Sequence, residues 1–309
     1  MGETSQMKFR SHETFFIRKG WLSKGMRAVQ NDPLVFMRSG SESPTDTLGL
    51  GANMVKALRY WLQATGLTIE PKSGKRSQQF TDFGKLVFEN DPYFEETGTL
   101  WALHFLLASN KALATSWYYF FNEFNMRTFS KDDFTKAISN YLALQIEKIP
   151  SQRSLEDDFN CILGTYISRE KLQPGKTISP ENNIDCPLGE LGIVDVDSKA
   201  QRTFKKRTAN INLIPNSILL FGIIYQLQQN PGQSSRVQSS GTPIESLLNE
   251  RGSIGKIFNL DSVALLTGLY RLENSGCISV VTTAGIDEIR VRSNKGWLEC
   301  LADYYKEIG

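Results

Sequence analysis

The sequence predicts a mainly α-helical protein that carries small β-hairpin wings. Apolar residues recur at helical spacing in most segments, and the order helix, loop, helix, hairpin occurs near both ends of the chain. The 309 residues, 40% hydrophobic and 22% charged, are enough for about two or three globular domains. We expect a basic winged helix-turn-helix at 1–85, an aromatic-rich helical middle with a hairpin at 86–215, and a C-terminal winged-helix-like domain at 216–309.

The first third begins with a short helix that ends before Asp32-Pro33 and continues into a loop at 39–47. The segment Ala52–Thr65 has apolar residues at helical spacing, and Gly66 is expected to cap the C-terminus of such a helix. The sequence LTIE can then extend, PKSGKRS can turn, and QQFT can extend back. This order is typical of a winged helix-turn-helix.

The stretch LGLG at 48–51 resembles half of a dinucleotide-binding fingerprint. That fingerprint requires a strand before it and a third glycine, but SESPTDT precedes it and Met54 stands at the third position. We therefore interpret the glycines as a tight turn between two helices.

Charge is unevenly distributed along the chain. Residues 1–85 hold 13 Lys or Arg against 7 Asp or Glu, although the whole chain carries only +2. A basic surface on a winged helix is expected to face a polyanion, with one helix in the major groove and the wing on phosphates. The alternative is a winged helix that only packs against its neighbours. The predicted DNA-contacting residues are Arg18, Lys19, Lys24, Asn53, Lys56, Arg59, Lys72, Lys75 and Arg76.

The middle third is rich in aromatic residues. Helices are predicted at 99–110 and 117–125, and their aromatic side chains are expected to form core rather than to stack on bases. Ser130 with Asp133 predicts a capped helix through 148, and Ser154 with Asp157 predicts the start of another. A polar loop at 169–186 and a hairpin at 192–211 follow.

The C-terminal third repeats the winged-helix order. The expected elements are a helix within 216–229, a helix start at Thr242-Pro243, a further helix at 261–276, a hairpin at 277–292 and a last helix from 296. The candidate recognition helix carries only Arg271 as a basic residue. We expect this second unit to pack or to bind protein.

Several classes of chemistry are excluded. Only two histidines, His12 and His104, are present, and the chain has no Gly-x-Ser-x-Gly, Walker A or His-Glu-x-x-His motif. The four cysteines are far apart, which fits reduced thiols in a cytoplasmic protein. No signal peptide is evident, and the apolar run at 211–227 is too short for a bilayer of ~30 Å, so we expect no membrane partner.

Carboxylates supply the remaining chemical candidates. His12 and Glu13 are adjacent and precede Arg18 and Lys19, and a second group contains Asp91, Glu95 and Glu96. Such groups can hold Mg²⁺ or Mn²⁺ beside a phosphate. The alternative is that His12 and Glu13 make ordinary hydrogen bonds and that the acids near residue 91 cap a helix.

Short acid-x-Lys triplets, as in restriction-type nucleases, give weaker candidates. One is Glu70-Pro71-Lys72 with Asp46 upstream. The other is Asp197-Ser198-Lys199 with Asp185 upstream. Patterns this short arise often by chance.

Four blocks together resemble the bacterial SspB family of DNA phosphorothioation systems. They are FRSHETFFIRKGWLSKG, LGLGANMVKALRYWLQATGL, FTDFGKLVFENDPYFEETGTLWALHFLLA and CPLGELGIV, and they span about residues 9–193. The family's motifs fall on His12-Glu13-Thr14, on Gly51 with Asn53 and Met54-Val55, and on Asp91-Pro92-Tyr93 with Glu95.

The resemblance implies a protein that binds double-stranded DNA and nicks one strand, so that sulfur-transfer and ATPase subunits can modify the DNA in defence against phage. The resemblance does not identify the residues that cut. From the histidine and carboxylates within its motifs we expect His12, Glu13 and Asp91 to be catalytic and Glu13, Asp91 and Glu95 to be metal ligands. A non-catalytic DNA-recognition or regulatory subunit of the same complex is the first alternative. A scaffold whose basic third binds an acidic protein is the second.

Overall fold

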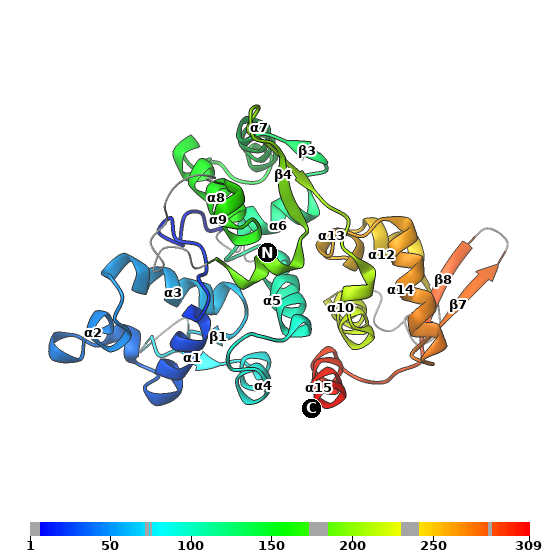
Figure 1. Ribbon diagram of the computed structural model, residues 1–309, viewed down its shortest axis with the longest axis horizontal. Coiled ribbons are helices and arrows are strands. Elements are labelled where there is room, and N and C mark those ends of the chain that lie inside the picture. Colours follow the sequence, from blue (N-terminus) through cyan, green and yellow to red (C-terminus); the bar gives the residue numbers. More distant parts are fainter. Residues whose placement is uncertain (1–6, 72–73, 75, 173–184, 230–240, 284–285) are drawn as a thin grey trace.

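The computed structural model describes residues 7–71, 74, 76–172, 185–229, 241–283 and 286–309. Within these residues the protein is mainly α-helical and carries one two-stranded and two three-stranded antiparallel sheets. The predicted fold class is therefore confirmed. Helices α1–α3 lie at one end of the molecule and the β7–β8 hairpin lies at the other, with α5 between them (Figure 1).

The N-terminal elements follow the predicted order, with one addition. The expected loop at 39–47 contains a short helix, because the Ser43 hydroxyl accepts a hydrogen bond from the Asp46 amide and Pro44 occupies the first turn. The turn at 48–51 links this helix to the next, with Gly49 in the left-handed region at φ 58°. The elements are α1 (Trp21–Asn31), η1 (Val35–Met37), η2 (Gly40–Glu42), α2 (Pro44–Leu48), α3 (Ala52–Ala64), β1 (Thr68–Ile69), β2 (Gln79–Phe80) and α4 (Asp82–Asn90).

The central elements surround α5, a helix whose side chains are buried on every face from Gly98 to Ala108. The Ser130–Asp133 capping box forms as predicted, but its helix ends at Ala143 instead of continuing to 148. The next helix is capped by Ser151, whose hydroxyl accepts from the Ser154 amide. The elements are α5 (Thr97–Ser109), α6 (Thr115–Asn122), β3 (Thr128–Phe129), α7 (Lys131–Ala143), α8 (Gln152–Tyr166), α9 (Arg169–Leu172), η4 (Pro187–Leu191), β4 (Val194–Ser198) and β5 (Thr203–Lys206).

The hairpin expected at 192–211 gains a third strand. β3 pairs with β5 and places Phe129 opposite Phe204, so the sheet order is β3-β5-β4. The sequence alone did not indicate this pairing, because β3 is only two residues long.

The C-terminal elements also follow the predicted order. Thr242 and Pro243 pair with β8 and form a short edge strand, so the helix that was expected to start there starts two residues later. The elements are η5 (Ile211–Leu213), α10 (Asn216–Gln229), β6 (Thr242–Pro243), α12 (Ile244–Asn249), α13 (Ile254–Ile257), α14 (Ser262–Asn274), β7 (Ile278–Thr283), β8 (Ile286–Val291) and α15 (Trp297–Ile308).

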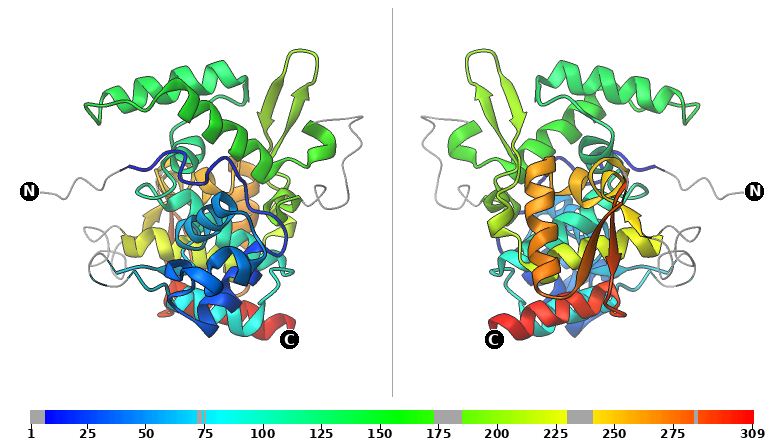
Figure 2. Two further views of the ribbon diagram at one scale, coloured as in Figure 1. Left: turned by 90° about the vertical axis from the view of Figure 1, so that its left-hand side faces the viewer. Right: turned by 90° about the vertical axis from the view of Figure 1, so that its right-hand side faces the viewer.

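The last helix returns to the middle of the molecule. α15 packs against α4, α5 and α10, and it lies beside α4 in the views of Figures 1 and 2. The Tyr304 hydroxyl accepts from the Gly98 amide, and the Tyr305 hydroxyl bonds to Thr99 at 2.7 Å. One hydrophobic core runs through all three predicted segments, and the domain boundaries remain a prediction.

The aromatic residues of the middle third belong to this core, as predicted. Trp117, Phe120 and Phe121 are buried and make edge-on ring contacts with their neighbours. Among the described residues, no helix is both long and apolar enough to cross a membrane.

Candidate nucleic-acid interface

Helix α3 presents an apolar face to the core and a polar face to solvent. Val55, Leu58 and Trp61 are buried, whereas Asn53 and Lys56 are exposed near the start of the helix. The Lys56 ammonium lies 3.4 Å from the Asn53 side-chain oxygen. This separation follows from the 3.6-residue period of the helix, and it leaves both polar groups accessible to a ligand.

Lys24 lies next to the same surface. Its ammonium donates to the Leu48 carbonyl at 3.0 Å, at the end of α2, while the residue stays exposed. An ammonium has three N–H bonds, so this contact leaves donors free. Lys24 therefore brings a positive charge from α1 to the turn that precedes α3.

Arg59 is engaged by a carboxylate of the β1–β2 hairpin. Its guanidinium makes two hydrogen bonds to the Glu70 carboxylate, at 2.5 and 2.8 Å, and the side chain is only 22% exposed. Gln63 and Gln78 donate to the same carboxylate at 3.2 Å. A fork-to-fork pair of this kind holds the two groups in one geometry, so Arg59 fixes the β1–β2 hairpin to α3.

The hairpin tip lies partly outside the described residues. Lys72 and Lys75 are not described, whereas Arg76 is exposed at the return of the hairpin. Of the three basic residues expected on the wing, the structure therefore describes Arg76.

Arg18 and Lys19 follow the N-terminal loop. The Arg18 guanidinium lies over the rings of Phe15 and Trp21, at 5.8 and 5.4 Å from their centroids. Burial, followed by repulsion from Arg169, lowers the pKa of Arg18. Lys19 is exposed, and its backbone amide donates to the Asp185 carbonyl at 3.1 Å.

His12 is buried in the core instead of facing solvent. Its Nε2 lies 2.8 Å from Asp158 Oδ1, its Nδ1 accepts from the Thr14 amide at 3.1 Å, and its ring stacks on Trp61. Because an amide N–H donates to Nδ1, the other nitrogen carries the proton and donates to Asp158. Both ring nitrogens are occupied, so the arrangement supports a positioning role for His12, and its catalytic role stays a prediction.

Asp158 holds the N-terminal loop at residues 10–14 in place. Besides His12, its carboxylate accepts from the Arg10 amide at 2.8 Å and from the Ser116 hydroxyl at 2.5 Å. Sequence reasoning missed Asp158, because it is 146 residues from His12 and only tertiary packing brings the two together.

Glu13 is held in an uncommon backbone conformation. Arg10, Glu13 and Thr14 have φ values of 54, 49 and 68°, in the left-handed region that costs energy for residues with a Cβ. Strain of this kind persists when surrounding contacts enforce it, and it is concentrated at functional sites. The loop thus presents a partly exposed Glu13 carboxylate that has no side-chain partner among the described residues.

The Asp91 carboxylate is engaged by backbone amides, and Asp91 itself is the C-terminal cap residue of α4. Its two oxygens accept from the amides of Glu95 and Glu96, at 2.9 and 3.0 Å, just before α5 begins. Glu96 in turn accepts from the Tyr304 hydroxyl at 3.1 Å, and Glu95 is exposed.

The predicted metal ligands are not gathered into one site. In the described parts of the chain, no three His, Cys, Asp or Glu side chains are close enough to hold an ion together. Glu13, Asp91 and Glu95 therefore do not fit a metal cage built from protein groups alone. The acid-x-Lys candidates are likewise engaged elsewhere, since Glu70 pairs with Arg59 and Asp197 pairs with Lys205.

Comparison with known proteins places the chain in a family. Residues 9–305 match the model of DUF4007, described as a protein family of unknown function. The chain belongs to the DUF4007 family. A search of functionally curated proteins gave no match.

Two solved structures share the fold of this family member. A crystal structure of SspB with bound magnesium ion has a TM-score of 0.81 and 25% identity, and covers 97% of this chain and 88% of its own. A second SspB crystal structure has a TM-score of 0.80 with the same identity and coverage. The resemblance to the SspB family inferred from the sequence blocks is thus confirmed over nearly the whole chain, including the C-terminal third.

Proposed function

We propose that this protein binds double-stranded DNA through the α1–α3 surface and the β1–β2 hairpin, and nicks one strand in a metal-dependent reaction. The single observation that carries the proposal is the nearly full-length similarity to SspB, one of whose structures contains magnesium. The exposed Asn53 and Lys56 on α3, with Lys24 beside them, agree with it. The purpose would be phosphorothioate modification in anti-phage defence, completed by sulfur-transfer and ATPase subunits.

The DNA-binding surface is assigned on geometric grounds. A helix whose first turns carry exposed Asn and Lys can enter the major groove, where Asn pairs with adenine edges and Lys with guanine or phosphate. Lys24 and Arg76 flank this helix and would contact the backbone. We assign Arg59 to positioning the hairpin, because Glu70 holds its guanidinium.

For the cleavage step we favour Glu13 among the three predicted catalytic residues. It is a carboxylate free of described partners on a strained loop that His12 and Asp158 hold in place. Asp91 is occupied by two amides, and His12 by Asp158 and Thr14. A divalent metal, which often binds one or two carboxylates together with substrate phosphates, would supply Lewis acidity at the scissile phosphate.

The test is conversion of supercoiled plasmid to open circles by purified protein with Mg²⁺, with Mn²⁺ and with EDTA. We expect open circles only with metal, and their loss in Glu13→Gln with duplex binding retained. Glu89→Gln is the matched control, because Glu89 is an exposed carboxylate on α4. Metal-independent conversion, or full activity in Glu13→Gln, would overturn the catalytic assignment.

A non-catalytic DNA-recognition subunit is the second candidate function. It is favoured by the lack of a three-ligand metal cluster among the described residues and by the engagement of His12 and Asp91 in the fold. Salt-dependent duplex binding without any open circles would select this function.

A further inference from the structure

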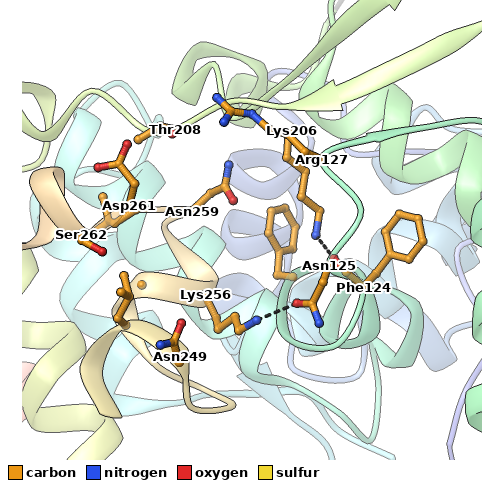
Figure 3. Close-up of a pocket in the computed structure, with 14 residues that line it drawn as sticks. Phe124, Asn125, Arg127, Lys206, Thr208, Asn249, Lys256, Asn259, Asp261 and Ser262 are labelled. Carbon is orange, nitrogen blue, oxygen red and sulfur yellow. Dashed lines mark hydrogen bonds between the residues drawn. The ribbon is translucent and has the colours of Figure 1, made fainter. Parts of the chain in front are cut away.

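A second positively charged site lies far along the chain from the DNA-binding candidates. A pocket of about 340 Å³ opens between the end of α6, the end of β5 and the α13–α14 connection. Figure 3 shows Lys206 and Arg127 on one side of it and Lys256 on the other. Neither the nickase proposal nor the SspB comparison assigns it a role.

Lys206 is buried in this pocket, and no carboxylate of the described residues forms an ion pair with it. The side chain is 9% exposed, and its ammonium lies 4.5 Å from the centroid of the Phe120 ring. It donates to the carbonyls of Phe120 and Phe124. An ammonium has three donors, so one N–H remains. Burying a charge is costly unless an opposite charge compensates it.

Two further cations line the same pocket. Lys256 donates to the Asn125 side-chain oxygen at 2.7 Å, and Arg127 is exposed with no side-chain partner among the described residues. The lining carboxylate, Asp261, is engaged in accepting from the Ala264 amide at the start of α14. Burial, followed by repulsion from Lys256, lowers the pKa of Lys206 to about 7, as expected where positive charges are brought together without a counter-ion.

We propose that this pocket binds the phosphate group of a small phosphorylated ligand of nucleotide size, with Lys206, Lys256 and Arg127 as its counter-ions. A pocket of a few hundred Å³ with a few polar groups is the usual size for such ligands. The amides of Asn125 and Asn259 line it and offer both donors and acceptors to the rest of the ligand. The phosphate would supply the negative charge that Lys206 lacks.

The test is isothermal titration calorimetry of the full chain at pH 6.5 in a buffer without phosphate. The ligands are inorganic phosphate, deoxyadenosine monophosphate and deoxyadenosine. We expect the two phosphate-containing ligands to bind and the nucleoside not to bind. Equal affinity for phosphate and the monophosphate would show that the pocket recognises the anion alone. Tighter binding of the monophosphate would show that Asn125 and Asn259 also contact the rest of the ligand.

Variants decide which residues hold the anion. Lys206→Met should weaken binding at least tenfold, and Lys256→Gln and Arg127→Gln severalfold each. Lys205→Gln is the matched control, since Lys205 is the preceding residue of β5 and pairs with Asp197 at 3.2 Å on the other side of the sheet. Lys56→Gln, on the DNA-binding candidate surface, should not change phosphate binding.

The competing reading makes Lys206 only a cap for the carbonyls at the end of α6. In that case Lys206→Met would lower the melting temperature, and the wild type would bind no phosphate at millimolar concentration. This result would overturn the proposal, as would unchanged binding in Lys256→Gln and Arg127→Gln. Since those two side chains are at the surface of the pocket, their variants remain informative if Lys206→Met fails to fold.

Discussion

Charged residues that look alike in this sequence have different surroundings in the structure. Lys56 and Arg59 are three residues apart on α3, yet Lys56 is exposed and Arg59 is held by Glu70. The same contrast separates Glu13, whose carboxylate has no partner among the described residues, from Asp91, whose carboxylate accepts from two backbone amides in the turn before α5. A charged side chain is available to a ligand only where no other group of the protein already compensates its charge.

Replacing Lys56 by Gln should weaken duplex binding without affecting folding. An exposed lysine on a phosphate contributes about 1–2 kcal/mol, or roughly tenfold in affinity, and the salt dependence should become shallower by about one unit. Fluorescence anisotropy with a labelled duplex at several salt concentrations measures both quantities. Lys306→Gln is the control, because Lys306 is an exposed lysine on α15. Equal affinities in the two variants would show that the DNA-binding surface lies elsewhere.

His104 should make the fold sensitive to mild acid. It is buried between the Tyr166 hydroxyl and the Ile257 carbonyl. Burial lowers its pKa from 6.5 to about 4, while the backbone hydrogen bond opposes the shift. The unfolded chain therefore binds a proton at a higher pH than the folded chain does. The resulting stability is complete above pH 6.5 and is lost as the pH falls towards 4, by about 3 kcal/mol in all.

Urea unfolding at pH 7.5 and pH 4.5 tests this linkage. The free energy of unfolding of the wild type should fall more between the two pH values than that of His104→Gln. The variant is expected to be less stable than the wild type already at pH 7.5. Tyr166→Phe serves as a comparison, since it removes the hydroxyl partner but keeps the titrating ring. Parallel losses in wild type and His104→Gln would exclude His104 as the cause.

At the scale of the elements, the β1–β2 hairpin depends on contacts with its neighbouring helices. The hairpin consists of two pairs of residues, too few to be stable alone. It is held by the Arg59–Glu70 pair and by the close approach of α4 to Leu67, the residue before β1. Arg59→Met should therefore destabilise the N-terminal region by roughly 1–3 kcal/mol, because it leaves Glu70 without its main partner.

Gly84 on α4 offers a test of this close approach. A Cβ at this position would lie 1.9 Å from the Leu67 carbonyl oxygen, whereas one at Gly51 would meet only the Met54 sulfur at 4.0 Å. Gly84→Ala should lower stability by about 1–3 kcal/mol, or more if the backbone cannot shift, because it overpacks a rigid contact. Gly51→Ala should cost about 1 kcal/mol or less, as for a substituted N-cap. Thermal unfolding of both variants compares them, and equal melting temperatures would contradict the expected difference.

At the scale of the whole molecule, the single core predicts cooperative unfolding. α15 joins the C-terminal elements to α4 and α5, and Tyr304 and Tyr305 bond to the first turn of α5. We expect one calorimetric transition, which Tyr304→Phe and Tyr305→Phe shift to lower temperature as a unit. Tyr270→Phe, an exposed tyrosine on α14, is the control. Three separate transitions would instead support the three predicted domains as independently folding units.

The sequence by itself determined most helices and hairpins of this protein, because their signals are local. The spacing of Val55, Leu58 and Trp61 fixes the buried face of α3, and Ser130 with Asp133 fixes the start of α7. It also indicated the SspB family, through short blocks that the structural similarity bears out. The two-residue strands β3 and β6 were missed, since each is defined by its pairing partner and not by its own residues.

Only the tertiary structure decided which polar residues are used by the fold and which are left for a ligand. His12 meets Asp158 across 146 positions, and Lys206 meets the carbonyls of Phe120 and Phe124 across more than 80. The physical reason is that an opposite charge or hydrogen-bond partner within a few ångströms compensates a charged group. The sequence does not show which partner that is, because the partner can lie far away along the chain. The sequence thus gives the kinds of groups present, and folding decides which of them remain free to act.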